Sequence, residues 1–287
     1  GGLVGFLNGG SVSQSFATGS VSGNTYTGGL AGYIDGASVS KSFATGAVSG
    51  SGQHTGGLIG YAKELGATGS TVSNSYATGN VTGTNYVGGL LASNQQSTVS
   101  DSYSLGDVPS SGVGVGRLVG YQVSSAQVTD SFWSSDSAGV TDGVGSNNSS
   151  TFDATGATTA ELQSVTTFTD ASWSVAESWS SSNTWGICES SGYPYLTWQY
   201  ASNSEACDDG GVSAPATSSS TATYTFTFLT SGGGVCFVDD NVAAGAYALP
   251  TSQVACTPEG TELVGWSVPG QVGAFSDGGV VTASGDQ

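Results

Sequence analysis

The stretch SVSQSFATGSVSG at residues 11–23 returns almost unchanged as TVSNSYATGNVTG at residues 71–83. It belongs to a unit that opens with GGLVGF at residue 1, GGLAGY at 28, GGLIGY at 56, GGLLAS at 88 and GRLVGY at 116. Each unit contains short strand-like pieces between Gly-rich turns, and no piece is long enough to bury an apolar face alone. The units are too short for propeller blades and lack the pattern of leucine-rich repeats. The repeat therefore predicts an all-β fold, a parallel β-helix or β-solenoid of about five coils over residues 1–136.

Stacked coils would align equivalent residues of successive units into ladders. We expect two such core ladders, one of leucines and one of aromatic residues: Leu3, Leu30, Leu58, Leu90 and Leu118, and Phe16, Phe43, Tyr76, Tyr103 and Phe132. The position between the two serines of the VSxS block is polar in every unit: Gln14, Lys41, Asn74, Asp101 and Asp130. In a regular strand it would share a face with Val12 and Phe16. The sequence therefore predicts a bend at this position, with Val12 and Phe16 both turned to the core.

These units resemble the GLUG motif, which is named for its GL[UV]G core and found in bacterial surface and secreted proteins. The resemblance continues through SFWSSD at 131–136, TTAELQSVTTF at 158–168 and TWGICESSGYPYLTW at 184–198. It thus covers residues 1–198 and implies a closing segment over 137–200 and an extracellular, cell-surface location.

The closing segment contains one candidate helix and several bulky aromatic residues. Thr158 followed by Glu161 forms a possible capping box, which predicts one short helix. Trp173, Trp179, Trp185 and Trp198 supply apolar groups able to cover an open end of the solenoid. Core packing is the simpler role for these rings, and a carbohydrate-stacking platform is the alternative.

The remaining chain divides into a linker and a small β module. Residues 201–222 are rich in Ser, Ala and Thr, as linkers are. The alternating strand TYTFTFLT and the later pattern in GAYALPTSQVACTPEGTELVGWS resemble the Listeria–Bacteroides repeat, the β-grasp-like module of internalin B-repeats, over about residues 223–268. Such modules act as stalks or spacers. Residues 223–287 are therefore expected to form a small disulfide-bonded β module.

The four cysteines form two sequential pairs, Cys188 with Cys207 and Cys236 with Cys256. They lack the close-set ligand pairs of a zinc site. Two local disulfides, formed in an oxidising compartment, are the favoured interpretation.

Few residues suggest catalysis or metal binding. His54 is the single histidine and lies in a turn, where we expect a solvent-exposed side chain. Asp101 and Asp130 occupy the same position in neighbouring units and could form a solvated ladder, a loose cation site or a carboxylate pair. Asp239 and Asp240 are a further weak candidate for Ca²⁺, but they lack the spacing of an EF-hand loop. We expect no enzyme activity and no cofactor, except that Ca²⁺ is a possible ion ligand.

The net charge of the chain limits the classes of partner that it can bind. The chain has 21 acidic and three basic residues, a formal net charge of −18, which repels nucleic acid. No apolar stretch is long enough to span a membrane. The leading hypothesis is an extracellular structural or adhesive surface protein, a stiff rod able to assemble end to end into a filament. It would bind itself, other cell-surface proteins or glycans. The alternative is a carbohydrate-binding or carbohydrate-active β-helix.

Overall fold

The computed structural model describes residues 1–65, 69–177, 182–200 and 202–208, except the side chains at 149–150, 203–204 and 208. Beyond these it describes the backbone of six strands between residues 224 and 283. The chain divides into two compact units, Gly1–Ala214 and Pro215–Gln287.

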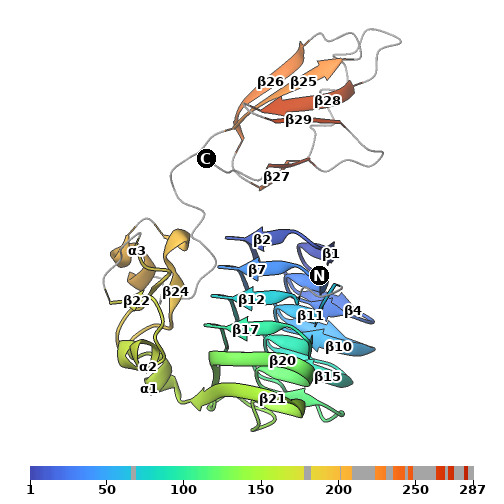
Figure 1. Cartoon of the computed structure of the whole chain (residues 1–287). Helices are drawn as coiled ribbons and strands as arrows, with labels where there is room; N and C mark the ends of the chain where they lie inside the picture. Colours follow the sequence, from blue (N-terminus) through green and yellow to red (C-terminus); the bar gives the residue numbers. More distant parts are fainter. Residues whose placement is uncertain are drawn as a thin grey trace. The chain divides into compact units, whose positions relative to one another are not determined.

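The first unit is built on a parallel β-solenoid of about five turns, as the repeat predicts (Figure 1). Each turn contributes short strands that pair in register with those of the turns on either side. The strands that begin the turns are β1 (Val4–Asn8), β6 (Ala31–Asp35), β11 (Ile59–Lys63), β16 (Leu91–Gln95) and β20 (Val119–Ser134). The next rows are β2 (Ser11–Ser13), β7 (Ser38–Ser40), β12 (Thr71–Ser73) and β17 (Thr98–Ser100), then β3 (Phe16–Ala17), β8 (Phe43–Ala44), β13 (Tyr76–Ala77) and β18 (Tyr103–Ser104).

Two further sheets close each turn. One contains β4 (Val21–Gly23), β9 (Val48–Gly50) and β14 (Val81–Thr82), and the other β5 (Thr27–Gly28), β10 (Gln53–Gly56), β15 (Asn85–Gly88) and β19 (Val115–Gly116). Strand β21 (Val144–Ala157) pairs in parallel with β20 and continues the stack. The solenoid therefore extends beyond residue 136, the boundary expected from the repeat.

The leucine ladder lies in the solenoid interior. Leu30, Leu58, Leu90 and Leu118 have no exposed surface, and the valine of each VSxS block packs in the same cluster. Leu3, in the first coil, is 52% exposed. The predicted leucine ladder is thus confirmed for the inner coils.

The bend predicted between the two serines is confirmed. All five residues at this position have a positive φ between 47° and 49°, the left-handed conformation that non-glycine residues adopt only rarely: Gln14, Lys41, Asn74, Asp101 and Asp130. We call this row the corner residues. A left-handed residue turns the chain and shifts the alternation of the side chains that follow it.

The serine after each corner residue stabilises the turn. The Ser42 hydroxyl donates to the Ser40 carbonyl at 2.7 Å, and the backbone N–H of Ser42 donates to Oγ of Ser75 in the next coil at 3.2 Å. The same pattern links Ser75 to Ser102 and Ser102 to Ser131. Because these groups are buried, the bonds satisfy donors that would otherwise be costly to bury. They explain why this serine recurs in every coil.

The expected direction of the aromatic ladder is wrong. After the corner, Ala44 and Ala77 point into the leucine cluster, whereas Phe43 and Tyr76 belong to a separate cluster outside the solenoid interior. Phe43, Tyr76 and Tyr103 nevertheless have no exposed surface, and their rings stack at centroid distances of 4.8 and 5.1 Å. They are buried because another segment covers them.

That covering segment comprises residues 158–200 and lies along one side of the stack (Figure 1). It contains α1 (Thr159–Leu162), α2 (Val165–Asp170), the 3₁₀ helix η1 (Thr197–Gln199) and the small sheet β22 (Val175–Ala176), β23 (Trp185–Gly186) and β24 (Tyr195–Leu196). The capping box of Thr158 and Glu161 opens α1 as predicted, but α2 makes a second helix where one was expected. We call residues 158–200 the lateral segment.

Covering the solenoid end was therefore the wrong role for the tryptophans of this segment. Trp173 and Trp185 pack on the aromatic ladder instead, and Trp179 lies outside the described residues. In the last coils Trp133 and Phe152, 6.1 Å apart between ring centroids, pack against the leucine cluster from inside.

The predicted disulfide between Cys188 and Cys207 is present, with the Cα atoms 5.4 Å apart. Cys207 lies in helix α3 (Asn203–Asp208), so this part of the expected linker is helical and tied to the lateral segment. The other expected pair, Cys236 and Cys256, lies outside the residues whose side chains are described.

The second unit consists of antiparallel strands. The sheet order is β26, β25, β28, β29, and β27 pairs with β30. The bounds are β25 (Tyr224–Thr230), β26 (Val235–Val242), β27 (Gly245–Tyr247), β28 (Leu263–Val268), β29 (Gln271–Ala274) and β30 (Val281–Ala283). The predicted strand in TYTFTFLT corresponds to β25.

Candidate functional site

The carboxylates singled out in the sequence lie at neighbouring corners. Asp101 and Asp130 each follow a strand residue paired with its counterpart, Ser100 with Thr129. Partial burial raises the pKa of Asp101, a hydrogen bond from Ser100 opposes that rise, and the nearby Asp130 adds to it. Within the described residues, no group of three or more His, Cys, Asp or Glu could hold a metal ion. Asp239 and Asp240 lie on β26, and their side chains are outside the described residues.

The expected exposure of His54 is wrong. The side chain is only 9% exposed, and its Nδ1 lies 2.6 Å from Oγ of Ser93. Burial lowers the pKa of His54 from 6.5 to about 4, so the ring is neutral at neutral pH. Its ring stacks between those of Tyr26 and Tyr86, at centroid distances of 5.1 and 4.9 Å.

His54 is the centre of a continuous row of rings on the outside of the solenoid. Phe6, Tyr33 and Tyr61 lie in register on β1, β6 and β11, and Tyr121 follows on β20. The adjacent column is formed by Tyr26, His54 and Tyr86, all with positive φ. Together they form what we call the aromatic row: Phe6, Tyr26, Tyr33, His54, Tyr61, Tyr86 and Tyr121.

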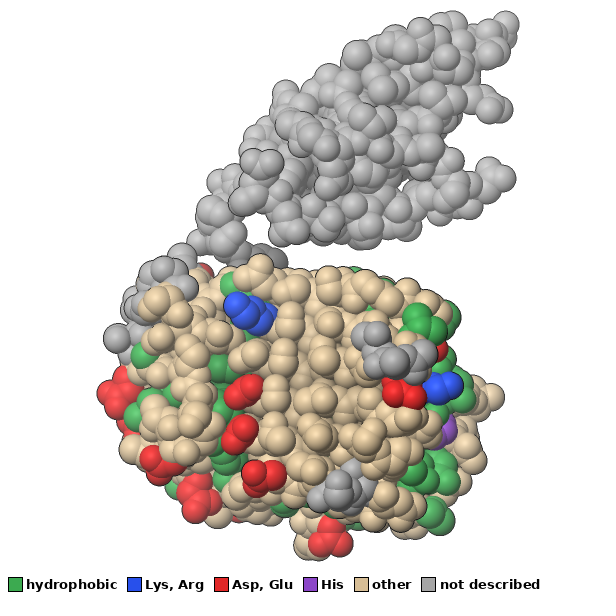
Figure 2. Space-filling view, in the orientation of Figure 1, with side chains coloured by type: hydrophobic (Ala, Val, Ile, Leu, Met, Phe, Trp, Pro, Cys, Tyr) green, Lys and Arg blue, Asp and Glu red, His purple; other side chains and the backbone are tan. Residues whose placement is uncertain are grey.

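The rings of the row turn their faces to one another. Phe6 stacks on Tyr33 at 4.9 Å and Tyr26 on Tyr33 at 5.4 Å, while Tyr61 meets Tyr33 edge-on at 5.1 Å. Tyr61 also meets Tyr26 and His54 edge-on, at 5.0 Å each, so the row contains both stacked and edge-to-face contacts. Phe6 is 54% and Tyr26 40% exposed. Hydrophobic side chains are visible along the right-hand edge of the solenoid in Figure 2.

The electrostatic surroundings of the row keep its phenols protonated. Burial, together with the neighbouring tyrosines, raises the pKa of Tyr61 to about 12. Burial and the carboxylate of Asp35, whose Oδ2 lies 3.4 Å from the Tyr33 hydroxyl, raise the pKa of Tyr33. These hydroxyls therefore remain hydrogen-bond donors across the physiological range.

Sequence reasoning missed the row, although a signal was present. The residue two positions before each GGL block is Tyr26, His54 or Tyr86, and Gly114 takes this place before GRL. Gly114 also has a positive φ, and a Cβ there would lie 2.8 Å from the Tyr86 ring. The residue two positions before these blocks therefore always adopts the left-handed conformation. It has an aromatic side chain except at Gly114, where the Tyr86 ring leaves no space for a side chain.

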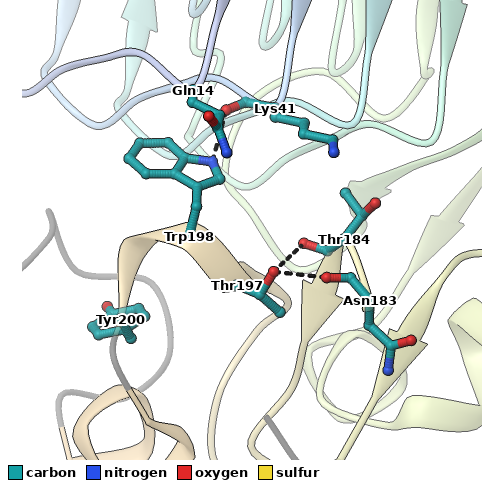
Figure 3. Close-up of a pocket in the computed structure, with 7 residues that line it drawn as sticks. All are labelled: Gln14, Lys41, Asn183, Thr184, Thr197, Trp198 and Tyr200. Atoms are coloured by element: carbon teal, nitrogen blue, oxygen red, sulfur yellow. Dashed lines mark hydrogen bonds between the residues drawn. The ribbon is translucent and has the colours of Figure 1, made fainter. Parts of the chain in front are cut away.

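A second feature is a cavity of about 270 Å³ between the lateral segment and the corners of the first two coils (Figure 3). The residues that line it are Gln14, Lys41, Asn183, Thr184, Thr197, Trp198 and Tyr200. The Trp198 indole N–H donates to the backbone carbonyl of Lys41 at 2.9 Å, and the Thr197 hydroxyl donates to the carbonyl of Asn183 at 2.7 Å. The first bond joins the lateral segment to the solenoid, and the second lies within the lateral segment.

Comparison with known proteins supports the repeat assignment. A family model described as the GLUG motif matches residues 23–49. No curated protein and no solved structure matches the chain. Nothing in these comparisons supports the expected internalin-B-repeat-like module at 223–268. The GLUG motif is found in bacterial surface proteins, and no helix among the described residues is long and apolar enough to cross a membrane. The family match is consistent with an extracellular protein.

Proposed function

We propose that this chain is an extracellular surface protein with a structural and adhesive role, in which the solenoid is a stiff support and the aromatic row is the contact face. The GLUG match and the regular parallel stack support a surface repeat protein. The observation that carries the adhesive role is the aromatic row, a continuous set of rings on the outside of the solenoid in which all but His54 are partly exposed. Exposed aromatic groups of this extent commonly mark interaction sites.

The geometry of the row favours a protein partner. Stacking of a sugar ring needs a free aromatic face, and most faces in the row are already occupied by neighbouring rings at about 5 Å. Ring edges with phenol groups instead offer apolar contact and hydrogen bonding side by side, as tyrosine-rich protein interfaces do. The partner is a second copy of this chain or another surface protein. If the partner is a second copy of this chain, end-to-end assembly into a filament is one possible arrangement.

The proposal is tested by the binding of the purified full chain to intact producing cells, measured by flow cytometry. The variant Phe6→Ser with Tyr26→Ser removes the two most exposed rings of the row. We expect this double variant to lose about tenfold or more in binding, because aromatic anchors dominate interface energies.

Leu3→Ser is the matched control, since Leu3 lies in the same coil, is 52% exposed and is outside the row. It should bind as the unmodified chain does. Equal binding by all three proteins would reject the row as the contact face. Failure of antibodies to label the chain on intact, unpermeabilised cells would reject the extracellular location.

A further inference from the structure

Three tyrosines of the aromatic row form a compact group on the outside of the solenoid. Tyr33 and Tyr61 lie in register on β6 and β11, with their ring centroids 5.1 Å apart. Tyr26 packs against both, at 5.4 Å from Tyr33 and 5.0 Å from Tyr61. Tyr26 is 40% exposed, and the other two side chains are partly exposed. We call these residues the tyrosine triad, and small reagents in solution can reach it.

The phenol groups of the triad lie close enough to influence one another's ionisation. At Tyr33, burial is the main cause of the raised pKa, followed by Asp35, and Tyr26 adds to it. At Tyr61, burial again comes first, and Tyr26 and Tyr33 add to the rise in pKa. Two tyrosyl radicals join at the ring carbons beside their hydroxyl groups. Neighbouring phenol groups therefore bring the carbons that can react close together.

Asp35 gives one ring of the triad a proton acceptor. The Tyr33 hydroxyl donates to Oδ2 of Asp35 at 3.4 Å, and Oδ1 of the same carboxylate is buried without a hydrogen-bond partner in the described residues. A phenol that loses an electron becomes strongly acidic, and a carboxylate held beside it can take up the proton as the electron leaves. Tyr33 is therefore the ring of the triad that is most readily converted into a neutral radical.

We propose that the tyrosine triad is a site of oxidative cross-linking, at which Tyr33 is joined to Tyr26 or Tyr61 as dityrosine. The oxidant is hydrogen peroxide, used by a peroxidase. Each of two phenols loses one electron and one proton, the two radicals form one carbon–carbon bond, and the hydrogen on each joined carbon moves to the phenol oxygen. The peroxide takes up the two electrons and two protons and leaves as two molecules of water. The bond ties neighbouring coils together on the outside of the solenoid.

Two other tyrosine pairs provide internal comparisons. Tyr76 and Tyr103 stack at 5.1 Å, but neither has any exposed surface. Tyr86 and Tyr121 are 5.0 Å apart and partly exposed, yet within the described residues no carboxylate is hydrogen-bonded to either hydroxyl. Of these three groups, only the triad combines exposure with a proton acceptor. The chain also has no methionine, a side chain that would otherwise consume oxidant.

The test treats the full chain with a peroxidase and limiting hydrogen peroxide, at a dilution where two chains rarely meet. Proteolytic digestion and mass spectrometry then locate each dityrosine, which joins two tyrosine peptides with the loss of two hydrogen atoms. We expect cross-links that contain Tyr33 to be about tenfold or more abundant than those between Tyr86 and Tyr121, because a positioned base assists the proton transfer. We expect none between Tyr76 and Tyr103.

Variants separate the roles of the ring and of its proton acceptor. Tyr33→Phe keeps the ring but removes the phenol, so cross-links within the triad should fall about tenfold or more. Tyr193→Phe removes a phenol outside the row and should leave them unchanged. Asp35→Asn should slow the appearance of Tyr33 cross-links several-fold. Glu64→Gln is its matched control, because the Glu64 carboxylate accepts from Nε2 of Gln96 at 2.5 Å and from no phenol of the described residues.

Three results would overturn the proposal. They are no dityrosine in the unmodified chain although the peroxide is consumed, equal yields at the triad and between Tyr86 and Tyr121, or equal rates in Asp35→Asn and Glu64→Gln. The reaction takes place within one chain and needs no partner. Row variants that fail to reduce cell binding leave this test unaffected, so the two proposals fail independently.

Discussion

The indole N–H of Trp198 donates a hydrogen bond of 2.9 Å to the backbone carbonyl of Lys41, 157 residues earlier in the chain. Lys41 is a corner residue, and its left-handed conformation has a φ of 49°. Trp185 and Trp173 make corresponding bonds at the third and fifth coils. The lateral segment is thus attached to the solenoid at a row of bends that the repeat itself creates.

Removing the central tryptophan should loosen this attachment. Trp185 is fully buried and contacts the rings of Tyr76 and Tyr103. We expect Trp185→Ala to lower the free energy of unfolding by about 3–5 kcal/mol, as large-to-small changes in a core do. Trp185→Phe keeps a ring but loses the bond to Asn74, so its cost should be smaller. Chemical denaturation followed by circular dichroism measures both, and equal costs would contradict a packing role.

The serine ladder predicts a positional effect. Ser75→Ala leaves the buried N–H of Ser42 without its acceptor and should cost about 1–3 kcal/mol. Ser15→Ala is the matched control, because no backbone N–H of the described chain donates to its hydroxyl. Ser15→Ala should lower the free energy of unfolding by clearly less than Ser75→Ala does. If denaturant unfolding gave the same loss for both, the hydrogen bond between coils would not be the stabilising element.

His54 predicts a dependence of stability on pH. Its pKa is lowered from 6.5 to about 4 in the folded chain, so the unfolded chain takes up a proton first as the pH falls. The stability that the neutral ring contributes is fully present above about pH 6.5 and is lost as the pH falls through about 4.

Thermal unfolding between pH 7 and pH 4 measures this effect. His54→Phe keeps a stacked ring without a titrating group, so its melting temperature should fall less over that interval than that of the unmodified chain. Identical falls in the two proteins would show that the histidine is not buried in its neutral form.

Asp101 predicts an effect of opposite sign. Burial raises its pKa, so the folded chain is penalised when the carboxylate is ionised. Asp101→Asn should therefore increase the free energy of unfolding at pH 7, and asparagine also tolerates the left-handed conformation. The gain should disappear below the usual carboxyl pKa of about 3.8, where the carboxyl is neutral in both states. A loss of stability at pH 7 would instead indicate that this carboxylate has a favourable partner.

Repetition made the stack, the leucine ladder and the bend predictable. In a regular strand, alternation would turn the repeated polar residue toward the core. The chain avoids this by bending at that residue, and Gln14 and Lys41 do adopt the left-handed conformation of a bend. The direction after the turn was not predictable by the same argument. Phe43 and Ala44 are both apolar, so either could face the interior. Ala44 does so, and Phe43 is buried outside the interior because residues 158–200 cover it.

The two candidate surfaces were missed for a related reason. The cavity lies between Lys41 and residues more than 140 positions later, such as Asn183, and no local pattern encodes that contact. The sequence around His54 predicts an exposed turn residue, because the ring partners that bury His54 lie on other coils. Local chemistry did suffice for the capping box of Thr158 and Glu161 and for the disulfide of Cys188 and Cys207.

Oxidative footprinting of the full chain bound to intact cells shows whether the chain adheres through its aromatic row. Phe6 and Phe16 form an internal comparison, since they lie in the same coil and are 54% and 43% exposed, but only Phe6 belongs to the row. We predict that binding protects Phe6 and Tyr26 from labelling and leaves Phe16 as reactive as in the free chain. Protection of Phe16 with unchanged labelling of Phe6 and Tyr26 would contradict the account.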